Sequence, residues 1–169
     1  MEYNICMNKP SVTIRSTGPE DAPWILSFVK QEWGSDMMVT KGQIHHMADC
    51  KGLIAEKNNI PVGLLVYETK KKDMEIISLN AVKKYAGVGT GLLEKLTRIA
   101  KQNGIKKIWL VTTNDNLDAL RFYQKRGFVM SAVYPNAIEK SRAIKPQIPL
   151  YGDYGIALRD EIELAKEVQ

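Results

Sequence analysis

Hydrophobic and polar positions follow two different periods along the chain, and these periods predict a succession of strands and helices. Continuous or alternating apolar runs predict strands, whereas apolar residues spaced three and four apart predict helices. The expected strands are Val12–Arg15, Gly52–Glu56, Val62–Glu68, Glu75–Val82, Ile105–Thr112, Phe128–Val133 and a last one beginning at Ile156–Leu158. The expected helices run from about Thr17 to Glu32, from the Gly87–Gly91 turn to Lys101, and from Leu117 to Arg126. This order predicts one α/β domain in which helices flank a mixed β-sheet.

Two segments lack a clear period. Gly34–Lys51 is expected to be a loop with a short helix near Gln43–Ala48, and Pro135–Pro149 is expected to be irregular. The turn Lys57–Pro61 between two apolar runs is typical of a hairpin. We expect residues 1–11 to be an N-terminal extension and residues 12–169 to form the domain.

The stretch from Glu75 to Lys101 combines a predicted strand, a glycine-spaced turn and an amphipathic helix. Gly87 and Gly89 have no Cβ, so an anion can approach the backbone N–H groups of the turn closely. The helix dipole adds about half a positive charge at the same point. The turn therefore predicts a phosphate site; the alternative is that the glycines only permit a tight turn. The residues expected at this site are Lys84, Tyr85, Ala86, Gly87, Val88, Gly89 and Thr90.

Two common nucleotide-binding motifs do not match this turn. A dinucleotide fold requires a third glycine where Leu92 stands, and an acidic residue about twenty positions later. The Gly-Lys-Ser/Thr ending of a nucleoside-triphosphate loop is also missing from the sequence. The expected ligand is therefore another phosphorylated cofactor.

Composition and charge narrow the class of protein. Hydrophobic residues make up 44% of the chain and charged residues 25%, which is ordinary for a globular domain. The net charge is +5, and residues 71–126 alone carry +7. Solvated helix faces and a polyanionic cofactor are both explanations of this surplus. Without a nucleic-acid-binding motif we expect no nucleic-acid partner.

Location and redox state follow from what the sequence lacks. No apolar run approaches ~20 residues, so we expect no membrane partner. The start of the chain does not read as a signal peptide. Cys6 and Cys50 are far apart and have no metal-like spacing, which indicates two free thiols and a cytoplasmic protein.

Two motifs resemble those of a known family. Lys84–Gly89 is similar to Gln/Arg-x-x-Gly-x-Gly/Ala, the pyrophosphate loop of the GNAT superfamily of acetyl-CoA-dependent N-acetyltransferases. Asn116–Phe128 resembles the second signature of that superfamily, Asn-x-x-Ala-x-x-Phe-Tyr-x-x-x-Gly-Phe. Lys84 stands where the family usually has Gln or Arg. It keeps the positive charge of Arg but lacks the planar guanidinium that binds a phosphate through two N–H groups. The tail after Lys145 resembles an uncharacterised bacterial branch of the superfamily.

The resemblance implies a GNAT-like mixed sheet with splayed central strands and acetyl-CoA as the cofactor. In this family the open edge of the central strand pairs with the pantetheine arm of the cofactor. The residues implied on that strand are Leu79, Asn80, Ala81 and Val82; for Asn80 the alternative is an ordinary buried hydrogen bond. Asn116 is implied to bind the same arm, the alternative being a helix N-cap. Tyr123 is implied to lie at the sulfur and donate a proton to the leaving thiolate, the alternative being a packed aromatic.

Three other residues bear on the acceptor. Glu75 resembles a general base of some relatives, the alternative being a solvent-facing carboxylate at a strand end. Trp33 lies where relatives line the acceptor pocket, the alternative being a core or surface role. The pair His45–His46 is interpreted as exposed loop histidines, because no third ligand is suggested nearby, and no metal is predicted.

The sequence therefore predicts an N-acetyltransferase that moves acetyl from acetyl-CoA to an amine by direct attack in a ternary complex. No serine or cysteine stands in a nucleophile motif, which argues against an acyl-enzyme. The expected acceptor is a small-molecule or peptide amine, and a homodimer is left open. The alternative hypothesis is a non-catalytic module that binds and senses acyl-CoA.

Overall fold

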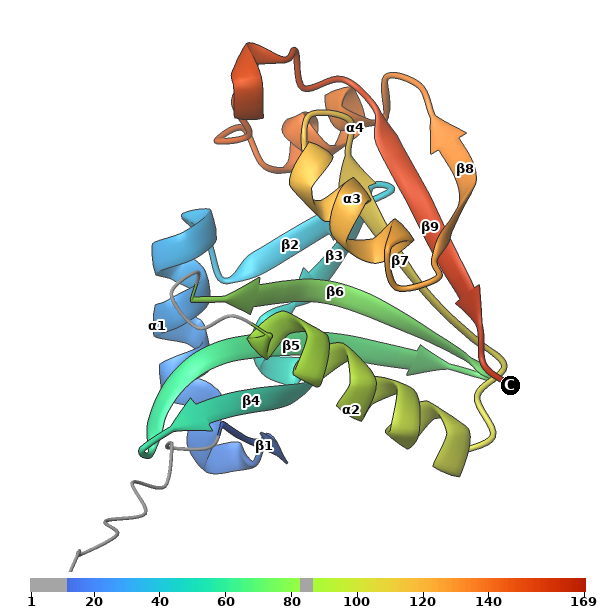
Figure 1. Cartoon of the computed structure of the whole chain (residues 1–169). Coiled ribbons are helices and arrows are strands. Elements are labelled where there is room, and N and C mark those ends of the chain that lie inside the picture. Colours follow the sequence, from blue (N-terminus) through green and yellow to red (C-terminus); the bar gives the residue numbers. More distant parts are fainter. Residues whose placement is uncertain (1–11, 83–86) are drawn as a thin grey trace, which may run out of the picture.

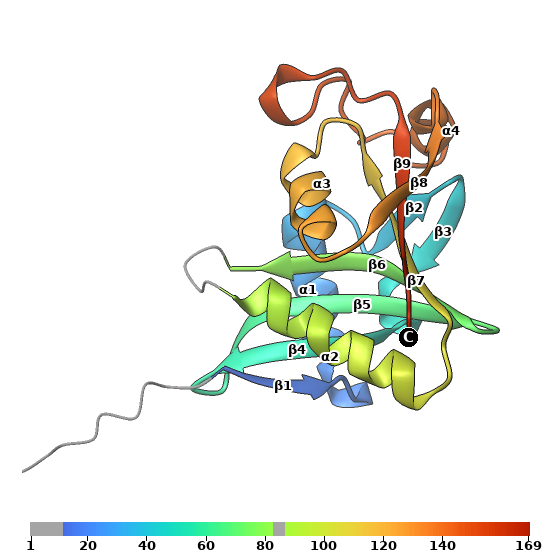
Figure 2. The same cartoon turned by 45° about the vertical axis from the view of Figure 1, so that its right-hand side comes forward.

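The computed structural model describes residues 12–82 and 87–169 (Figures 1 and 2). Its strands are β1 (Thr13–Ser16), β2 (Met37–Thr40), β3 (Gln43–His46), β4 (Lys51–Lys57), β5 (Ile60–Lys70), β6 (Asp73–Ala81), β7 (Lys107–Thr113), β8 (Val129–Tyr134) and β9 (Glu161–Glu167). Its α-helices are α1 (Ala22–Trp33), α2 (Val88–Gln102), α3 (Leu117–Gln124) and α4 (Ala137–Ile144). Single 3₁₀ turns are η1 (Pro19–Asp21), η2 (Met47–Asp49) and η3 (Asp153–Gly155). Among the described residues, no helix is long and apolar enough to cross a membrane.

Seven strands form one mixed sheet in the order β1-β4-β5-β6-β7-β9-β8. The β6–β7 pair is parallel and the other neighbours in this sheet are antiparallel. Helix α2 lies across β4, β5 and β6 on one face, while α1 and the small β2–β3 sheet lie on the other (Figures 1 and 2). The predicted α/β architecture is thus confirmed.

Two apolar clusters hold these layers together because side chains of a strand alternate between its faces. On the α2 face, Leu92 and Leu96 of α2 are completely buried against Leu65 of β5. On the opposite face, Val29 of α1 packs with Leu64. Leu64 and Leu65 are neighbours in sequence and belong to different clusters, so β5 is buried on both sides.

The central strands separate in the middle of the sheet. Strand β6 pairs with β7 only from Asp73↔Lys107 to Ile76↔Leu110, although β6 continues to Ala81 and β7 to Thr113. Figure 1 shows the two strands together near the C-terminus and diverging toward their far ends. The predicted splaying of the central strands is therefore confirmed.

Three predictions of secondary structure were wrong. The expected short helix near Gln43–Ala48 is instead the hairpin partner of β2, with Met38 paired to His45 and Val39 to Ile44. The segment Pro135–Pro149, expected to be irregular, contains α4. The last strand begins at Glu161 rather than at Ile156, because residues before it form η3 and an isolated bridge. The β2–β3 hairpin is local, but its strands have only four residues each, which is too short for a clear period. Helix α4 and strand β9 depend on partners distant in sequence, which local periodicity does not reveal.

Candidate active site

The gap between β6 and β7 opens into a cleft of about 1340 Å³. Its walls come from α1, the β2 strand, the ends of β6 and β7, the first turn of α2, helix α3 and the segment after α4. Of the predicted residues, the cleft contains Trp33, Leu79, Ala81, Val82, Gly87, Gly89, Thr90, Asn116 and Tyr123. Elements separated by more than a hundred residues thus converge on one cavity, which is large enough for a cofactor and an acceptor.

The open edge of β6 provides backbone hydrogen-bonding groups to this cleft. The Val82 N–H donates to the Val62 carbonyl on the β5 side, at 2.9 Å. Alternate residues of an antiparallel strand bond to the same neighbour, so Asn80 also directs its backbone groups toward β5. Leu79 and Ala81 then direct their N–H and C=O groups into the gap. A ligand amide in the gap would satisfy these groups as an added strand does.

The first turn of α2 forms the other end of the cleft. Gly87 has φ +87°, a left-handed conformation suited to glycine, and it caps the helix. A Cβ on Gly89 would lie 3.3 Å from the Phe122 ring, so the turn also packs tightly against α3. Lys84, Tyr85 and Ala86 lie outside the described residues.

Arg126 is a cationic group at this turn that the sequence analysis did not single out. Its guanidinium donates to the Thr90 Oγ1 from both Nε and Nη2, at 3.2 and 2.5 Å. The same group lies 3.6 Å from the centroid of the Phe122 ring. It therefore joins α3 to the start of α2 and brings a positive charge to the predicted phosphate site. In the sequence, the available signal for Arg126 was its position within the second motif, directly before Gly127.

Asn116 and Tyr123 occupy the two ends of α3. The Asn116 Oδ1 accepts from the Ala119 N–H at 3.0 Å, so Asn116 is the N-cap of the helix, and it also lines the cleft. Tyr123 is 6% exposed and packs edge-on against Phe122 and Phe128. Burial raises the pKa of the Tyr123 phenol, which therefore keeps its proton at neutral pH. Asn116 is thus a helix N-cap and Tyr123 is a packed aromatic, as the two alternatives predicted, and both residues also line the cavity.

Trp33 and Asn80 meet across the cleft rim. The indole Nε1 donates to the Asn80 Oδ1 at 3.4 Å, and the same oxygen accepts from the Ser78 hydroxyl at 2.7 Å. Trp33 is 40% exposed, so its ring is available to a ligand. Asn80 therefore orients Trp33 rather than lining the cavity itself.

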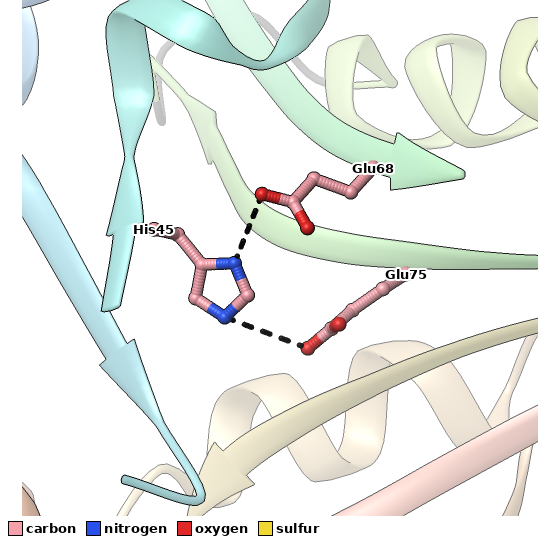
Figure 3. A group of neighbouring side chains, drawn as sticks. All are labelled: His45, Glu68 and Glu75. Carbon is pink, nitrogen blue, oxygen red and sulfur yellow. Dashed lines mark hydrogen bonds and ion pairs between the residues drawn. The ribbon is translucent and has the colours of Figure 1, made fainter. Parts of the chain in front are cut away.

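Glu75 lies deeper than a strand-end residue, and the solvent-facing alternative is wrong. Its side chain is 5% exposed, and it sits beside His45, which comes from β3 and is 2% exposed (Figure 3). The interpretation of His45 as an exposed loop residue is also wrong. Burial raises the pKa of Glu75, although His45, Lys70 and a hydrogen bond from Thr40 counteract it. A carboxylate with a raised pKa is a better proton acceptor near neutrality.

The imidazole of His45 is held between two carboxylates and a hydroxyl. Its Nδ1 lies 3.1 Å from the Glu68 Oε1, and its Nε2 lies 2.9 Å from the Thr40 Oγ1. Thr40 lines the cleft and also donates to the Glu75 Oε1 at 3.3 Å. The His45, Glu68 and Glu75 side chains are metal-binding types within 4.8 Å of one another. Hydrogen bonds already occupy both ring nitrogens, so the arrangement suits proton transfer as it stands.

Glu161 is a second acidic residue that the sequence analysis missed. It is 2% exposed in the cleft wall, and its two oxygens accept from the Ser141 hydroxyl and from the Lys41 N–H. Burial raises the pKa of Glu161. Lys145 nearby donates its Nζ to the carbonyls of Trp33 and Met37. These contacts tie α1, β2, α4 and β9 around the cavity.

Known proteins resemble this chain in sequence and in fold. The acetyltransferase (GNAT) family matches residues 20–128. The uncharacterized protein YxbD of Bacillus subtilis (strain 168) is 43% identical over 147 residues, which cover 86% of this chain and 92% of that protein. An IAA acetyltransferase from Bacillus cereus ATCC 14579 has 25% identity and a TM-score of 0.70, covering 93% of this chain and 99% of that one.

A further solved structure shows the fold together with a ligand. It is a GNAT family acetyltransferase from Elizabethkingia anophelis with acetyl-CoA bound, with 22% identity, a TM-score of 0.69, and coverage of 94% of this chain and 99% of that one. The chain described here belongs to the GNAT acetyltransferase family, as its two motifs predicted.

Proposed function

We propose that this protein is an N-acetyltransferase that moves an acetyl group from acetyl-CoA to an amine of a small molecule or peptide. The observation that carries the proposal is the open edge of β6 in a cleft that also contains the α2 turn and Tyr123. A backbone edge, an anion site and a buried proton donor in one cavity are what a pantetheine thioester requires.

The binding residues divide between the two ends of the cofactor. The Gly87–Thr90 turn and Arg126 would hold the pyrophosphate, with Lys84, Tyr85 and Ala86 retained as predicted contacts. The backbone groups of Leu79 and Ala81 would pair with the pantetheine amides, and the Asn116 amide nitrogen, not used by the cap, would add a donor. Bound acetyl-CoA supplies an acetyl carbonyl activated by its thioester.

The chemistry needs one proton removed and one donated. An acceptor amine has an ordinary pKa of ~10, so a base must take its proton before or during attack. Glu75, whose pKa burial raises, is the proposed final acceptor of that proton. The Tyr123 hydroxyl holds its proton until the thiolate leaves and then donates to the sulfur. Trp33, at the cleft rim, would contact the acceptor.

The test is thiol release from acetyl-CoA by the purified protein in the presence of polyamines, aminoglycosides, amino acids and peptides. We expect one class of amine to accelerate release of free CoA and to gain one acetyl group by mass spectrometry. Tight CoA binding without release in any mixture would instead identify a non-catalytic acyl-CoA-binding module.

A further inference from the structure

Thr40, His45 and Glu68 form a hydroxyl–imidazole–carboxylate series that begins in the cleft wall. Thr40 ends β2, His45 lies on the paired strand β3, and Glu68 lies on β5. The successive separations are 2.9 Å from Thr40 Oγ1 to His45 Nε2 and 3.1 Å from His45 Nδ1 to Glu68 Oε1 (Figure 3 shows the His45–Glu68 contact). This is the geometry in which a carboxylate orients an imidazole and the imidazole takes a hydroxyl proton.

We propose that Thr40, His45 and Glu68 form a proton relay that carries the amine proton from the acceptor cleft to Glu75. The inference rests on the proposed function and deepens it. Thr40 is the member that contacts the acceptor, whereas His45 and Glu68 act through it.

The hydroxyl of Thr40 has two hydrogen-bonding partners, and these correspond to the two ends of the transfer. It reaches the His45 Nε2 at 2.9 Å and the Glu75 Oε1 at 3.3 Å. When the Thr40 hydroxyl hydrogen points at His45, a lone pair of the Thr40 oxygen is open to the amine N–H. When this hydrogen points at Glu75, the Thr40 oxygen accepts a hydrogen bond from the protonated His45. Rotation about one C–O bond therefore connects the two states.

The protons balance over one cycle. The amine N–H proton passes to the Thr40 oxygen as the Thr40 hydroxyl proton passes to His45 Nε2, and the nitrogen lone pair forms the new bond to the acetyl carbon. The C–S bond of the thioester then breaks, and the leaving thiolate takes the proton of the Tyr123 hydroxyl. The His45 Nδ1–H remains bonded to Glu68 throughout. The Nε2 proton then returns to Thr40 as the Thr40 proton passes to Glu75. His45 ends neutral in its starting tautomer, and Glu75 carries the proton.

Glu75 connects the relay to solvent. It borders a second pocket of about 300 Å³ that is also lined by Lys41, Lys70 and Lys107 and is separate in its lining from the main cleft. A proton taken on the cleft side can therefore leave on the other side without passing the bound acceptor.

Charged and polar groups surround the His45 imidazole and its carboxylate partners. Glu68 and Glu75 flank it, the Cys50 thiol donates to the Glu68 Oε1 at 3.4 Å, and Lys70 lies 3.6 Å from Glu68. Burial alone would raise the pKa of Glu68, but the bonds from His45 and Cys50 outweigh it and lower that pKa. Glu68 therefore stays ionised and keeps the imidazole oriented.

The decisive variants are Thr40→Val, which preserves shape and removes the hydroxyl, and Thr40→Ser, which restores the hydroxyl. With an accepted amine at saturating acetyl-CoA, we expect Thr40→Val to lower kcat at least tenfold and Thr40→Ser to recover most of it. The acid limb of the pH–kcat profile should shift in Thr40→Val, because the cleft is disconnected from its proton acceptor. Affinity for CoA should not change.

His45→Gln should lower kcat to a similar degree, and the Thr40→Val/His45→Gln double variant should be no slower than the slower single one, because the two act as a unit. The matched control is His46→Gln, since His46 is exposed on the same strand. It should keep the wild-type kcat and pH profile. Hydrolysis of acetyl-CoA by water provides a second readout that needs no amine.

Three results would overturn the relay. Wild-type kcat and pH profile in Thr40→Val would exclude it even if His45→Gln failed to fold. Stoichiometric zinc in the purified protein, with activity lost on chelation and restored by Zn²⁺ alone, would make the cluster a metal site. If the wild-type protein releases no CoA, either with amines or by hydrolysis, the proposed function and the relay both fail. If the wild-type protein turns over and the variants match it, only the relay fails.

Discussion

At the scale of single residues, burial adjusts the ionisation of the groups that the site requires. Tyr123 is held neutral in an apolar layer, and Glu75 is made more basic by the same kind of surroundings. In the proposed reaction Tyr123 gives a proton and Glu75 takes one. Burial keeps the Tyr123 phenol protonated and makes Glu75 a stronger base, while the same raised pKa makes the phenol a weaker acid than free tyrosine. The protonation behaviour of each group is thus set by its position in the fold.

Tyr123→Phe keeps the ring and its edge contacts and removes the hydroxyl alone. We expect folding and CoA affinity to stay within a few tenths of a kcal/mol, and kcat at saturating acetyl-CoA to fall tenfold or more. Steady-state kinetics measure kcat, and thermal scans without and with CoA measure folding and CoA affinity. Tyr67→Phe is the matched control, because Tyr67 is also 6% exposed, belongs to the same apolar cluster and does not line the cleft. Equal turnover of wild type and Tyr123→Phe would make Tyr123 a packing residue.

At the scale of elements, the start of α2 depends on the backbone conformation of one glycine. Gly87 has φ +87°, and among the described residues no atom outside its chain neighbours lies within 4 Å of the place that a Cβ would take, so alanine there would meet backbone strain without a clash with those residues. That strain is about 1–2 kcal/mol, and the turn can relieve it only by moving its N–H groups. Gly87→Ala should therefore weaken CoA binding at least tenfold, which corresponds to ~1.4 kcal/mol. Calorimetry measures this change in affinity.

The opposite end of α2 offers the matched control. Gly104 has φ +65° and equally open surroundings, so Gly104→Ala introduces comparable strain far from the cleft. It should lower stability by a similar amount and leave CoA affinity unchanged. If both variants bind CoA as the wild type does, the phosphate site lies away from this turn.

Strand β9 carries two glutamates whose pKa values shift in opposite directions. Burial raises the pKa of Glu161 above 4.5. For Glu163, burial is outweighed by bonds from Tyr134, Lys41 and Ser131, and its pKa is lowered. The stability that Glu161 contributes is fully present below its unfolded-state pKa and is lost as pH rises through its folded-state pKa. The contribution of Glu163 is present above its unfolded-state pKa and is lost as pH falls through its folded-state pKa.

Glutamine at each position should therefore produce opposite pH trends. Relative to wild type, Glu161→Gln should gain stability between pH 4 and pH 8, and Glu163→Gln should lose stability over the same interval. Urea unfolding at the two pH values measures the free energies. Trends of the same sign in both variants would contradict the assignment of the two carboxylates.

The sequence predicted those elements whose signals are local. The β4–β5 hairpin, the apolar face of α2 and the capped start of α3 are each contained within a short stretch. His45 could not be placed, because its partners Glu68 and Glu75 lie 23 and 30 residues away. Glu161 was missed because its contact with the Lys41 N–H spans 120 residues. The cleft-lining residues of the α2 turn and of α3 therefore lie in motifs that the sequence reveals, whereas the His45–Glu75 cluster and Glu161 are assembled by tertiary contacts.

At the scale of the whole molecule, the sheet consists of two halves joined over a short length. On one side are β1, β4, β5 and β6, and on the other β7, β9 and β8, with the β6–β7 pairing ending at Ile76↔Leu110. A ligand in the gap contacts both halves and binds only the folded chain. At a hundred times its Kd, CoA should raise the free energy of unfolding by about 2.7 kcal/mol.

For a chain of this length, that stabilisation corresponds to a rise in Tm of roughly 5–11 °C. The backbone groups of Leu79 and Ala81 should also become protected from hydrogen exchange, because pantetheine amides would occupy the open edge of β6. Adenosine 3′,5′-bisphosphate has the head group of CoA without the pantetheine arm, and is the matched ligand. It should raise Tm by less and leave exchange at the β6 edge unchanged. If CoA raises Tm without protecting Leu79 and Ala81, the pantetheine arm does not pair with β6, and the widening of the sheet must serve the acceptor instead.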